Sequence, residues 1–408
     1  MMDNSVLLEI QKTAYDFFKD FTNFETNSKA FGLTLDHSMN LEKASIASTG
    51  FMLSSLVIGV KHHYLSYEEA YDKAYHTLIT LRDHVMHEFG FFAHFLDFKT
   101  AERMGKTEFS TIDTALCLCG VLTVDSFFKD EKISLITKNI MDRIDWDMFT
   151  FDYQGKPTLH MAYNPDRGGD YVQKKPGFIH HWDMFAEQLM MYVMIGGSKY
   201  KHLAKELYNG FSRVKGSYKE FEYIYSPGNS LFVYQFPLAW LDLKNVYDED
   251  HISWFDNART ATLAHQACAI DYASQYKTFS KYFFGFTAGD TRNGYRVYGG
   301  LPNTLNKLDT DGTICPFGPI GSIIFTPEIS IPAIEEMRKI EGLWGKYGFF
   351  DSFNFEEHTP WISKRYFSIN KGLELLMVNA YLYQDVHQAF MSHPIVIEGM
   401  EVLGWKKK

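Results

Sequence analysis

Apolar residues recur every three to four positions along most of the chain, and this spacing predicts helices. Start signals support several of them: Ser66 precedes one polar first turn, and Ser110 forms a capping box with Asp113 before another. We therefore expect an all-α protein. The predicted helices, with approximate ends, cover residues 5–20, 41–62, 67–88, 110–128, 131–144, 180–196, 199–215, 231–244, 251–275, 319–325, 328–340 and 371–390.

Long loops rich in Gly, Tyr, Phe and Asp follow alternate predicted helices. They cover residues 90–109, 150–179, 216–230, 276–318 and 341–370. Loops of this length within a compact domain are usually functional. Two of them contain the segments FEYIYS at 221–226 and YRVYGG at 295–300, whose aromatic and β-branched residues favour short strands.

Paired helices with long loops on one side predict an (α/α)6 barrel, a toroid of six helical hairpins. A helical bundle with a separate α+β domain is the alternative. The inner helices of a toroid should carry little charge and many small residues, and the segments 44–60, 114–124 and 188–198 meet both conditions. No linker or run of like charge divides the chain, so we expect a single catalytic domain over residues 1–408.

Composition and charge narrow the class of ligand. Aromatic residues make up 16% of the chain, and their flat faces suit stacking on sugar rings or nucleobases. The formal net charge of −10 opposes a polyanion, whose affinity comes mainly from Lys and Arg contacts with phosphate. We therefore expect a neutral oligo- or polysaccharide and no nucleic acid. No stretch approaches 18 uncharged apolar residues, so we expect no membrane partner.

The N-terminal segment and the cysteines indicate a compartment. The segment 1–21 has the pattern of an amphipathic helix and not of a signal peptide, which predicts a cytoplasmic protein, or a periplasmic or secreted one if a signal has been removed. Cys117, Cys119, Cys268 and Cys315 have no spacing typical of a zinc site, and free thiols fit a reducing compartment. We expect no metal and no cofactor.

The best candidate for catalysis lies in the segment 180–198. After its two histidines, the only acids are Asp183 and Glu187, four positions apart and thus on one face of a predicted helix. Apolar surroundings raise the pKa of a carboxyl group and keep it protonated nearer neutral pH, as a general acid requires. We favour Glu187 for this role. For Asp183, a solvated helix face or a helix cap is an equally good interpretation.

Two further acids are candidates for the same cleft. Asp113 either completes the capping box with Ser110 or lines the cleft, and Asp97 and Glu108 nearby favour the cleft. Asp351 lies between aromatic residues that could shape a sugar subsite, although an Asp-Ser turn is common. Another acid, Asp290, could pair with the neighbouring Arg292.

Seven segments together resemble the bacterial glucoamylase-like family that includes endo-β-1,2-glucanases (glycoside hydrolase family 144), with related domains in cyclic β-1,2-glucan synthases. Their order and spacing span nearly the whole chain. The segments are SIASTGF at 45–51, GFFAHFLDFKTAER at 90–103, FSTIDTAL at 109–116, WDMFAEQLMMYV at 182–193, FGFTAGD at 284–290, DGTICPFGPIGSIIFTPE at 311–328 and LWGKYGFFDSFN at 343–354.

The resemblance implies an (α/α)6 barrel that hydrolyses β-glucan, with β-1,2 linkages foremost, and inverts the anomeric centre. By position, Glu187 matches the proton donor, Asp351 the base that activates water directly or through a hydrogen-bonded chain, and Asp113 a residue lining the cleft. We expect the remaining substrate contacts at Asp97, Glu108, His181, Trp182, Asp183, Asp290, Arg292, Tyr347, Phe353, Asn354 and Trp361.

One departure from the family pattern leaves the substrate open. Met184, Phe185 and Ala186 replace a Gly-Tyr-Asn triplet beside the acid, so shorter oligosaccharides are also compatible. Three alternatives stay open on the sequence: an α-glucan exo-hydrolase of the glucoamylase type, a β-1,2-glucan transglycosylase, and a sugar-binding protein without catalysis. The sequence carries no signal for the oligomeric state.

Overall fold

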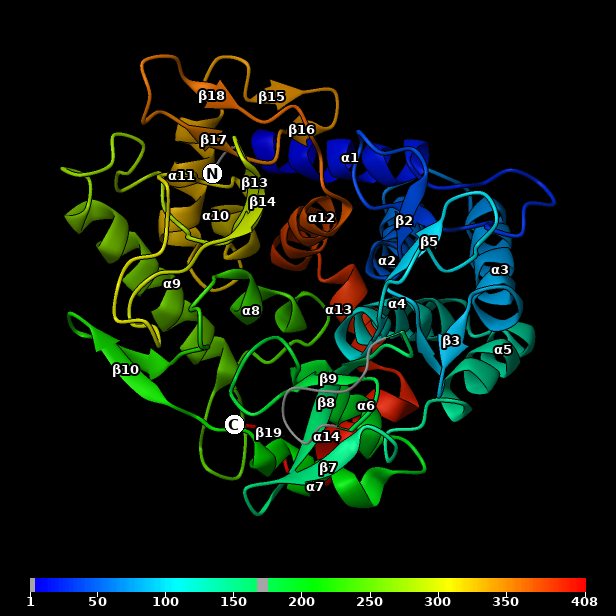
Figure 1. The fold of residues 1–408 in the computed structure, drawn as a ribbon. Coiled ribbons are helices and arrows are strands. Elements are labelled where there is room, and N and C mark those ends of the chain that lie inside the picture. Colours follow the sequence, from blue (N-terminus) through cyan, green and yellow to red (C-terminus); the bar gives the residue numbers. More distant parts are fainter. Residues whose placement is uncertain (1–3, 167–174) are drawn as a thin grey trace.

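The computed structural model describes residues 4–166 and 175–408, and its helices form a closed ring (Figure 1). Within these residues, inner and outer helices alternate along the chain, which confirms the predicted toroid. The inner helices are α2 (Ile46–Lys61), α4 (Thr111–Phe128), α6 (Leu189–Gly196), α8 (Phe232–Gln235), α10 (Phe317–Gly321) and α12 (Ser368–Leu382). The outer helices are α1 (Ser5–Asp20), α3 (Tyr67–Asp83), α5 (Glu131–Asp142), α7 (Lys201–Gly210), α9 (Trp254–Asp271) and α11 (Pro327–Met337).

The inner helices are the segments that the sequence leaves almost free of charge. α2 packs against α4 and α12, and every residue of α6 is buried. Small residues let the backbones approach closely: a Cβ atom added to Gly50 of α2 would lie 2.2 Å from the carbonyl oxygen of Leu116 on α4. Side chains larger than Gly would separate the two helices at this crossing.

Helix α4 is the one helix in the described part of the chain that is long and apolar enough to cross a membrane by length and composition. In the structure, however, 78% of this helix is buried inside the protein. It packs between α2 and α6 as a core helix of the ring.

The C-terminal helices α13 (Asp385–Met391) and α14 (Pro394–Val402) cover one end of the ring, the end at which the inner helices finish. His62 follows the last residue of α2 and pairs with Asp385 at 2.9 Å. Near the end of α4, Asp125 accepts a hydrogen bond from His393 at 3.1 Å. The opposite end of the ring, where the inner helices begin, is therefore the one left for the long loops.

These loops contain small antiparallel sheets, and the two segments predicted to favour strands form β11 and β14. β1, β2 and β5 form one sheet, and β6 to β9 form another. The strands are β1 (Thr34–Leu35), β2 (Lys43–Ser45), β3 (His87–Glu88), β4 (Phe91–Phe92), β5 (Phe95–Asp97), β6 (Phe109–Ser110), β7 (Thr150–Tyr153), β8 (Lys156–Tyr163), β9 (Phe178–His181), β10 (Lys215–Tyr218), β11 (Phe221–Ile224), β12 (Val246–Tyr247), β13 (Ala288–Thr291), β14 (Gly294–Val297), β15 (Trp344–Gly345), β16 (Gly348–Phe349), β17 (Phe353–Asn354), β18 (Trp361–Ile362) and β19 (Lys406–Lys407).

The predicted helix over 180–196 is wrong in its first half. Its first residues belong to β9, which pairs with β8, and α6 begins only at Leu189. Between them the Gln188 side chain holds an irregular segment, because it accepts from the backbone N–H of Ala186 at 2.8 Å and donates to the carbonyl of Met184 at 3.0 Å. Asp183 and Glu187 therefore do not share a helix face.

Other predicted helices are also shorter or divided. Those over 67–88, 199–215 and 251–275 end at Asp83, Gly210 and Asp271, and three more differ further. The helix predicted from residue 41 begins at Ile46, because the preceding residues form β2. The helix predicted over 231–244 shrinks to α8 and a short 3-10 turn at Pro237–Ala239, since proline has no N–H to continue an α-helix. The one over 371–390 divides into α12 and α13 at Gln384, whose backbone is left-handed with φ 64°.

Candidate active site

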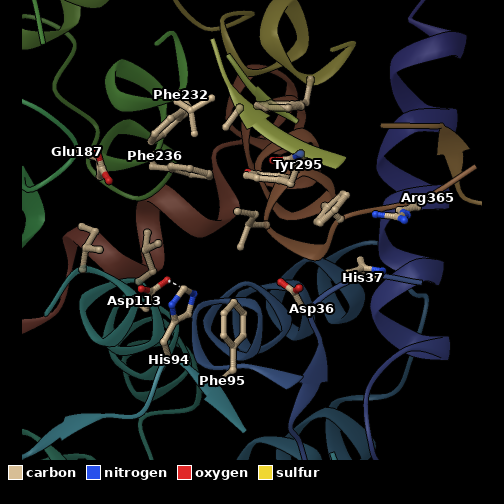
Figure 2. Close-up of a pocket in the computed structure, with 18 of the residues that line it drawn as sticks. Asp36, His37, His94, Phe95, Asp113, Glu187, Phe232, Phe236, Tyr295 and Arg365 are labelled. Atoms are coloured by element: carbon tan, nitrogen blue, oxygen red, sulfur yellow. Dashed lines mark ion pairs between the residues drawn. The ribbon is translucent and has the colours of Figure 1, made fainter. Parts of the chain in front are cut away.

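A pocket of about 530 Å³ lies where the inner helices begin (Figure 2). Asp113 on α4, Phe232 on α8, Phe317 on α10 and Asn370 on α12 all line it from the first turn or two of their helices. Glu187 lines it from the segment just before α6. The toroid therefore brings residues far apart in the sequence to one place.

The walls of the pocket differ in character. Figure 2 shows aromatic rings on one wall, a polar row on the facing wall, and a carboxyl group and a guanidinium group at opposite ends. The aromatic wall carries Phe232, Phe236 and Tyr295, the polar wall Asp113, His94, Phe95 and Asp36, and the two ends Glu187 and Arg365. Aromatic faces opposite hydrogen-bonding groups suit a flat ligand with polar edges.

Glu187 has the protonation behaviour that its sequence surroundings predict. Burial, together with the negative charge of Asp113, raises the pKa of Glu187 to about 7. No ion pair or side-chain hydrogen bond to another described residue restrains its carboxyl group. Near neutral pH this group can therefore hold a proton and give it to a ligand in the pocket.

Asp113 combines the two roles that the sequence left open. Its backbone N–H donates to the Ser110 hydroxyl oxygen at 3.2 Å, which caps α4. The same hydroxyl donates to Oδ2 of Asp113 at 2.6 Å. Oδ1 of Asp113 lies 3.4 Å from Nε2 of His94, and the residue lines the pocket. The cap thus fixes the carboxylate in the wall.

His94 links two carboxylates in the polar wall. Its Nδ1 lies 2.8 Å from Oε1 of Glu108, on the side opposite Asp113. Burial alone would lower the pKa of His94, but Asp113 and Glu108 outweigh it and raise the pKa. The hydrogen bond from His94 in turn lowers the pKa of Glu108 to about 2. Two carboxyl groups thus flank the one imidazole, and their contacts with it hold Asp113 and His94 in place beside the pocket.

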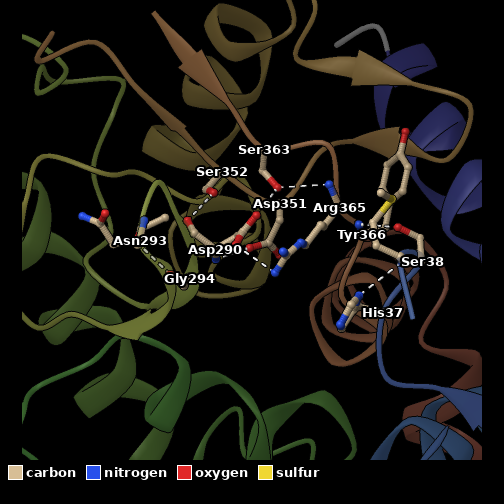
Figure 3. A network of polar contacts seen from close by, with 12 residues as sticks. His37, Ser38, Asp290, Asn293, Gly294, Asp351, Ser352, Ser363, Arg365 and Tyr366 are labelled. Carbon is tan, nitrogen blue, oxygen red and sulfur yellow. Dashed lines mark hydrogen bonds and ion pairs between the residues drawn. The ribbon is translucent and has the colours of Figure 1, made fainter. Parts of the chain in front are cut away.

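Asp351 does not line the pocket and lies in the polar network that contains Asp290 and Ser352 (Figure 3). Its Oδ2 accepts from the backbone N–H of Asp290 at 2.7 Å, and its Oδ1 accepts from the Asn370 amide at 2.7 Å. Burial raises the pKa of Asp351 to about 6. Because Asn370 lines the pocket and Asp351 does not, this geometry offers Asp351 no direct contact with a ligand or water in the pocket.

The sequence suggested an ion pair between Asp290 and Arg292, but the structure gives each of them a different partner. Its Oδ1 lies 3.4 Å from Nη1 of Arg365, and its Oδ2 accepts from the Ser363 hydroxyl at 2.7 Å. Arg292 points elsewhere: it donates to the carbonyl of Thr359 and pairs with Glu357. The physical reason is the turn of the β13–β14 hairpin: Asp290 lies in β13, whereas Arg292 follows the last residue of that strand, where strand alternation no longer sets the direction of the side chain.

None of the remaining predicted substrate contacts lines the pocket, and Glu108 and Asp290 lie behind residues that do. Asp97 accepts from the backbone N–H groups of Lys99 and Thr100 in a turn, and Trp182 is buried and donates to Thr111. Tyr347 packs against α1 and donates to Asp20. The residues in or beside β9, β17 and β18 are likewise absent from the lining: His181, Asp183, Phe353, Asn354 and Trp361.

Several residues that line the pocket were missed in the sequence. Asp36 and His37 directly follow β1, and Lys43 begins β2. The polar pair Asp36 and His37 shortly before the nearly uncharged helix α2 could have indicated that this segment lies at the pocket. His94 lies between aromatic residues in the segment 90–103. The residues around Arg365 in the sequence do not distinguish it from an arginine on the protein surface. Among the described residues no group of three or more His, Cys, Asp or Glu could hold a metal ion.

A family model described as "Putative glucoamylase" (Glycoamylase) matches residues 179–394, just over half of the chain. The chain belongs to the Glycoamylase family. This confirms the family resemblance of the sequence. The matched part of the Glycoamylase model includes Glu187, Asp351 and Arg365, whereas His94 and Asp113 precede it.

Known relatives share the whole length of this Glycoamylase chain. An exo β-1,2-glucooligosaccharide sophorohydrolase (non-reducing end) from Parabacteroides distasonis is 22% identical over 98% of the chain, which spans 58% of that protein's length. The crystal structure of a protein from Bacteroides uniformis that is also described as a "putative glucoamylase" has a TM-score of 0.86 at 23% identity. The match covers 100% of this chain and 98% of that one. The endo-β-1,2-glucanase of Chitinophaga pinensis, solved with sophorotriose and glucose, has a TM-score of 0.83 at 19% identity, covering 99% and 98%. These structures share the toroid.

Proposed function

We propose that this chain is a glycoside hydrolase that cleaves β-glucan or its oligosaccharides, with β-1,2-linked glucan as the first substrate to test. The observation that carries the proposal is Glu187, whose burial raises its pKa to about 7 on the wall of an open pocket, beside the negative charge of Asp113. A sophorohydrolase and an endo-β-1,2-glucanase among the relatives support the choice of linkage.

In the proposed reaction, Glu187 gives its proton to the glycosidic oxygen while the bond from that oxygen to the anomeric carbon breaks. Water adds to the anomeric carbon from the opposite face and loses a proton to a carboxylate. The products are two sugars, each with a new hydroxyl group. Two carboxyl groups whose environments separate their pKa values are the usual arrangement for this chemistry.

For the base we propose Asp351, acting through a hydrogen-bonded chain, with Asp113 acting directly as the alternative. The raised pKa of Asp351 makes it a better proton acceptor than an ordinary aspartate, but Asn370 stands between it and the pocket. Asp113 lines the pocket, and its own contact with His94 holds it in place. Added azide attacks without losing a proton, so it should restore turnover to whichever of Asp351→Asn and Asp113→Asn lacks the base.

The proposal is tested by the change Glu187→Gln. The wild-type chain should release reducing sugar from linear β-1,2-glucan, and the variant should lose about 100-fold or more of kcat, because an amide cannot donate the proton. The exposed Glu398→Gln is the matched control and should keep full activity. An unchanged kcat in Glu187→Gln would show that the acid is a different residue.

A second candidate function is α-glucan hydrolysis, which the description of the matching family favours. Parallel incubation with sophorooligosaccharides and maltooligosaccharides separates the two linkages. Proton NMR of the first product separates inversion from retention, and products longer than the substrate would indicate transglycosylation. Calorimetric binding without release of reducing sugar would indicate a sugar-binding protein. A single domain over residues 1–408 and a cytoplasmic location stay predictions.

A further inference from the structure

Figure 2 shows Asp36 and Arg365 toward the end of the pocket opposite Glu187, and each belongs to a cation–carboxylate pair. Lys43 Nζ lies 2.7 Å from Oδ2 of Asp36, and both residues line the pocket. Arg365, which also lines it, lies 3.4 Å from the buried Asp290. Each cation therefore has its own carboxylate, and this end of the pocket presents hydrogen-bond donors and acceptors with little net charge.

The fold holds both pairs in place. Asp36 and Lys43 face each other beyond the β1–β2 hairpin, where the backbone N–H of Asp36 donates to the carbonyl of Lys43 at 2.8 Å. The Lys43 ammonium lies 4.1 Å from the ring centre of Phe95. Arg365 is held through Asp290, whose side chain is only 6% exposed and is fixed by the Ser363 hydroxyl. Donors held this way lose little freedom when they bind a ligand.

The backbone segments around Ser38 and Tyr366, which carry residues of these pairs, are hydrogen-bonded to each other (Figure 3). The N–H of Ser38 donates to the carbonyl of Tyr366 at 3.0 Å, and the N–H of Tyr366 donates to the Ser38 hydroxyl oxygen at 3.1 Å. The N–H of Ser368 donates to the carbonyl of Asp36 at 3.0 Å. The segments that carry Asp36 and Arg365 are thus tied to each other beside the pocket.

We infer that Lys43, Asp36 and Arg365 form a chain-end subsite, which binds the hydroxyl groups of a terminal, uncharged sugar. A glucan chain would enter from the open side, stop at this subsite and place one linkage beside Glu187. The chain then acts on the ends of glucans and releases one short product of fixed length. This inference rests on the proposed function and adds the mode of action to it.

The first experiment follows product length at early times on linear β-1,2-glucan. Wild-type protein should release a single product length from the first time point. Arg365→Met should lower kcat/KM by about 10- to 100-fold, since hydrogen bonds from a charged group are lost, and should release several product lengths because the chain end is no longer held. Lys43→Met should act in the same direction, and Arg365→Lys should restore the single product.

Lys364→Met is the matched control. It also removes one positive charge, at the residue next to Arg365, but the Lys364 side chain is exposed and contacts Phe350. It should leave kcat/KM and product length unchanged. A ladder of product lengths from the wild-type protein at the first time point would overturn the inference, and so would an Arg365→Met variant with unchanged kcat/KM and product length.

A binding measurement separates this inference from the proposed function. In the Glu187→Gln background, calorimetry with sophorose and longer β-1,2-glucooligosaccharides should give an affinity that falls about 10- to 100-fold when Arg365→Met is added. If wild-type protein hydrolysed no glucan but this fall were seen, the proposed function would fail and the subsite would stand. Equal affinity in both variants, or tighter binding of glucose 6-phosphate than of glucose, would overturn the subsite.

Discussion

The two ends of the toroid use the same inner helices in opposite ways. Where these helices finish, α13 and α14 cover them, and polar side chains are paired, as His62 is with Asp385 and His393 with Asp125. Where the helices begin, a pocket stays open and Glu187 has neither an ion pair nor a side-chain hydrogen bond with the described residues. The covered end is arranged for stability, and the open end keeps a carboxyl group whose ionisation is unfavourable.

The difference between the ends predicts opposite effects of substitution. At the covered end, removing a contact should lower the free energy of unfolding and leave the specificity for substrate unchanged. At the open end, removing the unfavourable carboxyl group should raise the free energy of unfolding and abolish turnover. Such a trade between activity and stability is common at catalytic sites.

The largest effect is expected for Glu187→Gln as a function of pH. Below about pH 4.5 the carboxyl group is neutral in both the folded and the unfolded chain, so it does not affect stability. As pH rises to about 7, the unfolded chain releases its proton more readily than the folded one, and the wild-type protein loses stability. Denaturant unfolding should therefore find the variant more stable at pH 8 by up to about 3 kcal/mol relative to pH 4. A difference that did not depend on pH would contradict this account of the open end.

At the covered end, Gly399→Ala should cost about 3 kcal/mol of unfolding free energy. Its new Cβ atom would lie 1.9 Å from the carbonyl oxygen of Val193 on α6, and backbone cannot move aside as a flexible side chain can. Gly228→Ala is the control, since nothing lies within 4 Å of its Cβ position. Thermal or denaturant unfolding measures both. Equal free energies of unfolding for the two variants would mean that the close packing of α14 against α6 does not stabilise the protein.

Sequence reasoning worked where the signal is local. The first outer helix is found to the residue, because its apolar face repeats over four turns, and the charge-free segments correctly indicate the inner helices. Glu187 could be picked out because the residues after it are apolar. β9 was missed because its partner is the separate strand β8, and the Gln188 side chain, which holds the residues after β9, also has no local signal.

The end of the pocket that contains Lys43 and Arg365 could not be predicted from the sequence. Lys43 and Arg365 have the same local context as solvated surface cations, and the carboxylates that hold them lie on other segments. The sequence left open whether Asp351 acts directly or through a hydrogen-bonded chain, and that choice depends on tertiary structure, because Asn370 and not Asp351 lines the pocket. Spacing along the chain indicates that an acid is near the cleft but not on which side of the wall it lies.

A smaller effect is expected for His393→Ala, also at the covered end. The change removes a hydrogen bond to Asp125 and the cap at the start of α14, where Nδ1 accepts from the N–H of Ile395. We expect a loss of about 2 kcal/mol in unfolding free energy with kcat/KM unchanged. The exposed His202→Ala should change stability by less than about 0.5 kcal/mol. A fall in kcat/KM for His393→Ala would show that the two ends are coupled.

The central claim is that Glu187 holds its proton near neutral pH, and a direct titration tests it. Carbon-13 NMR of protein labelled at the glutamate carboxyl carbons, compared with Glu187→Gln, assigns the one resonance that disappears in the variant. The account predicts a midpoint near pH 7 for that resonance. A midpoint near 4.5, the ordinary value for glutamate, would contradict it.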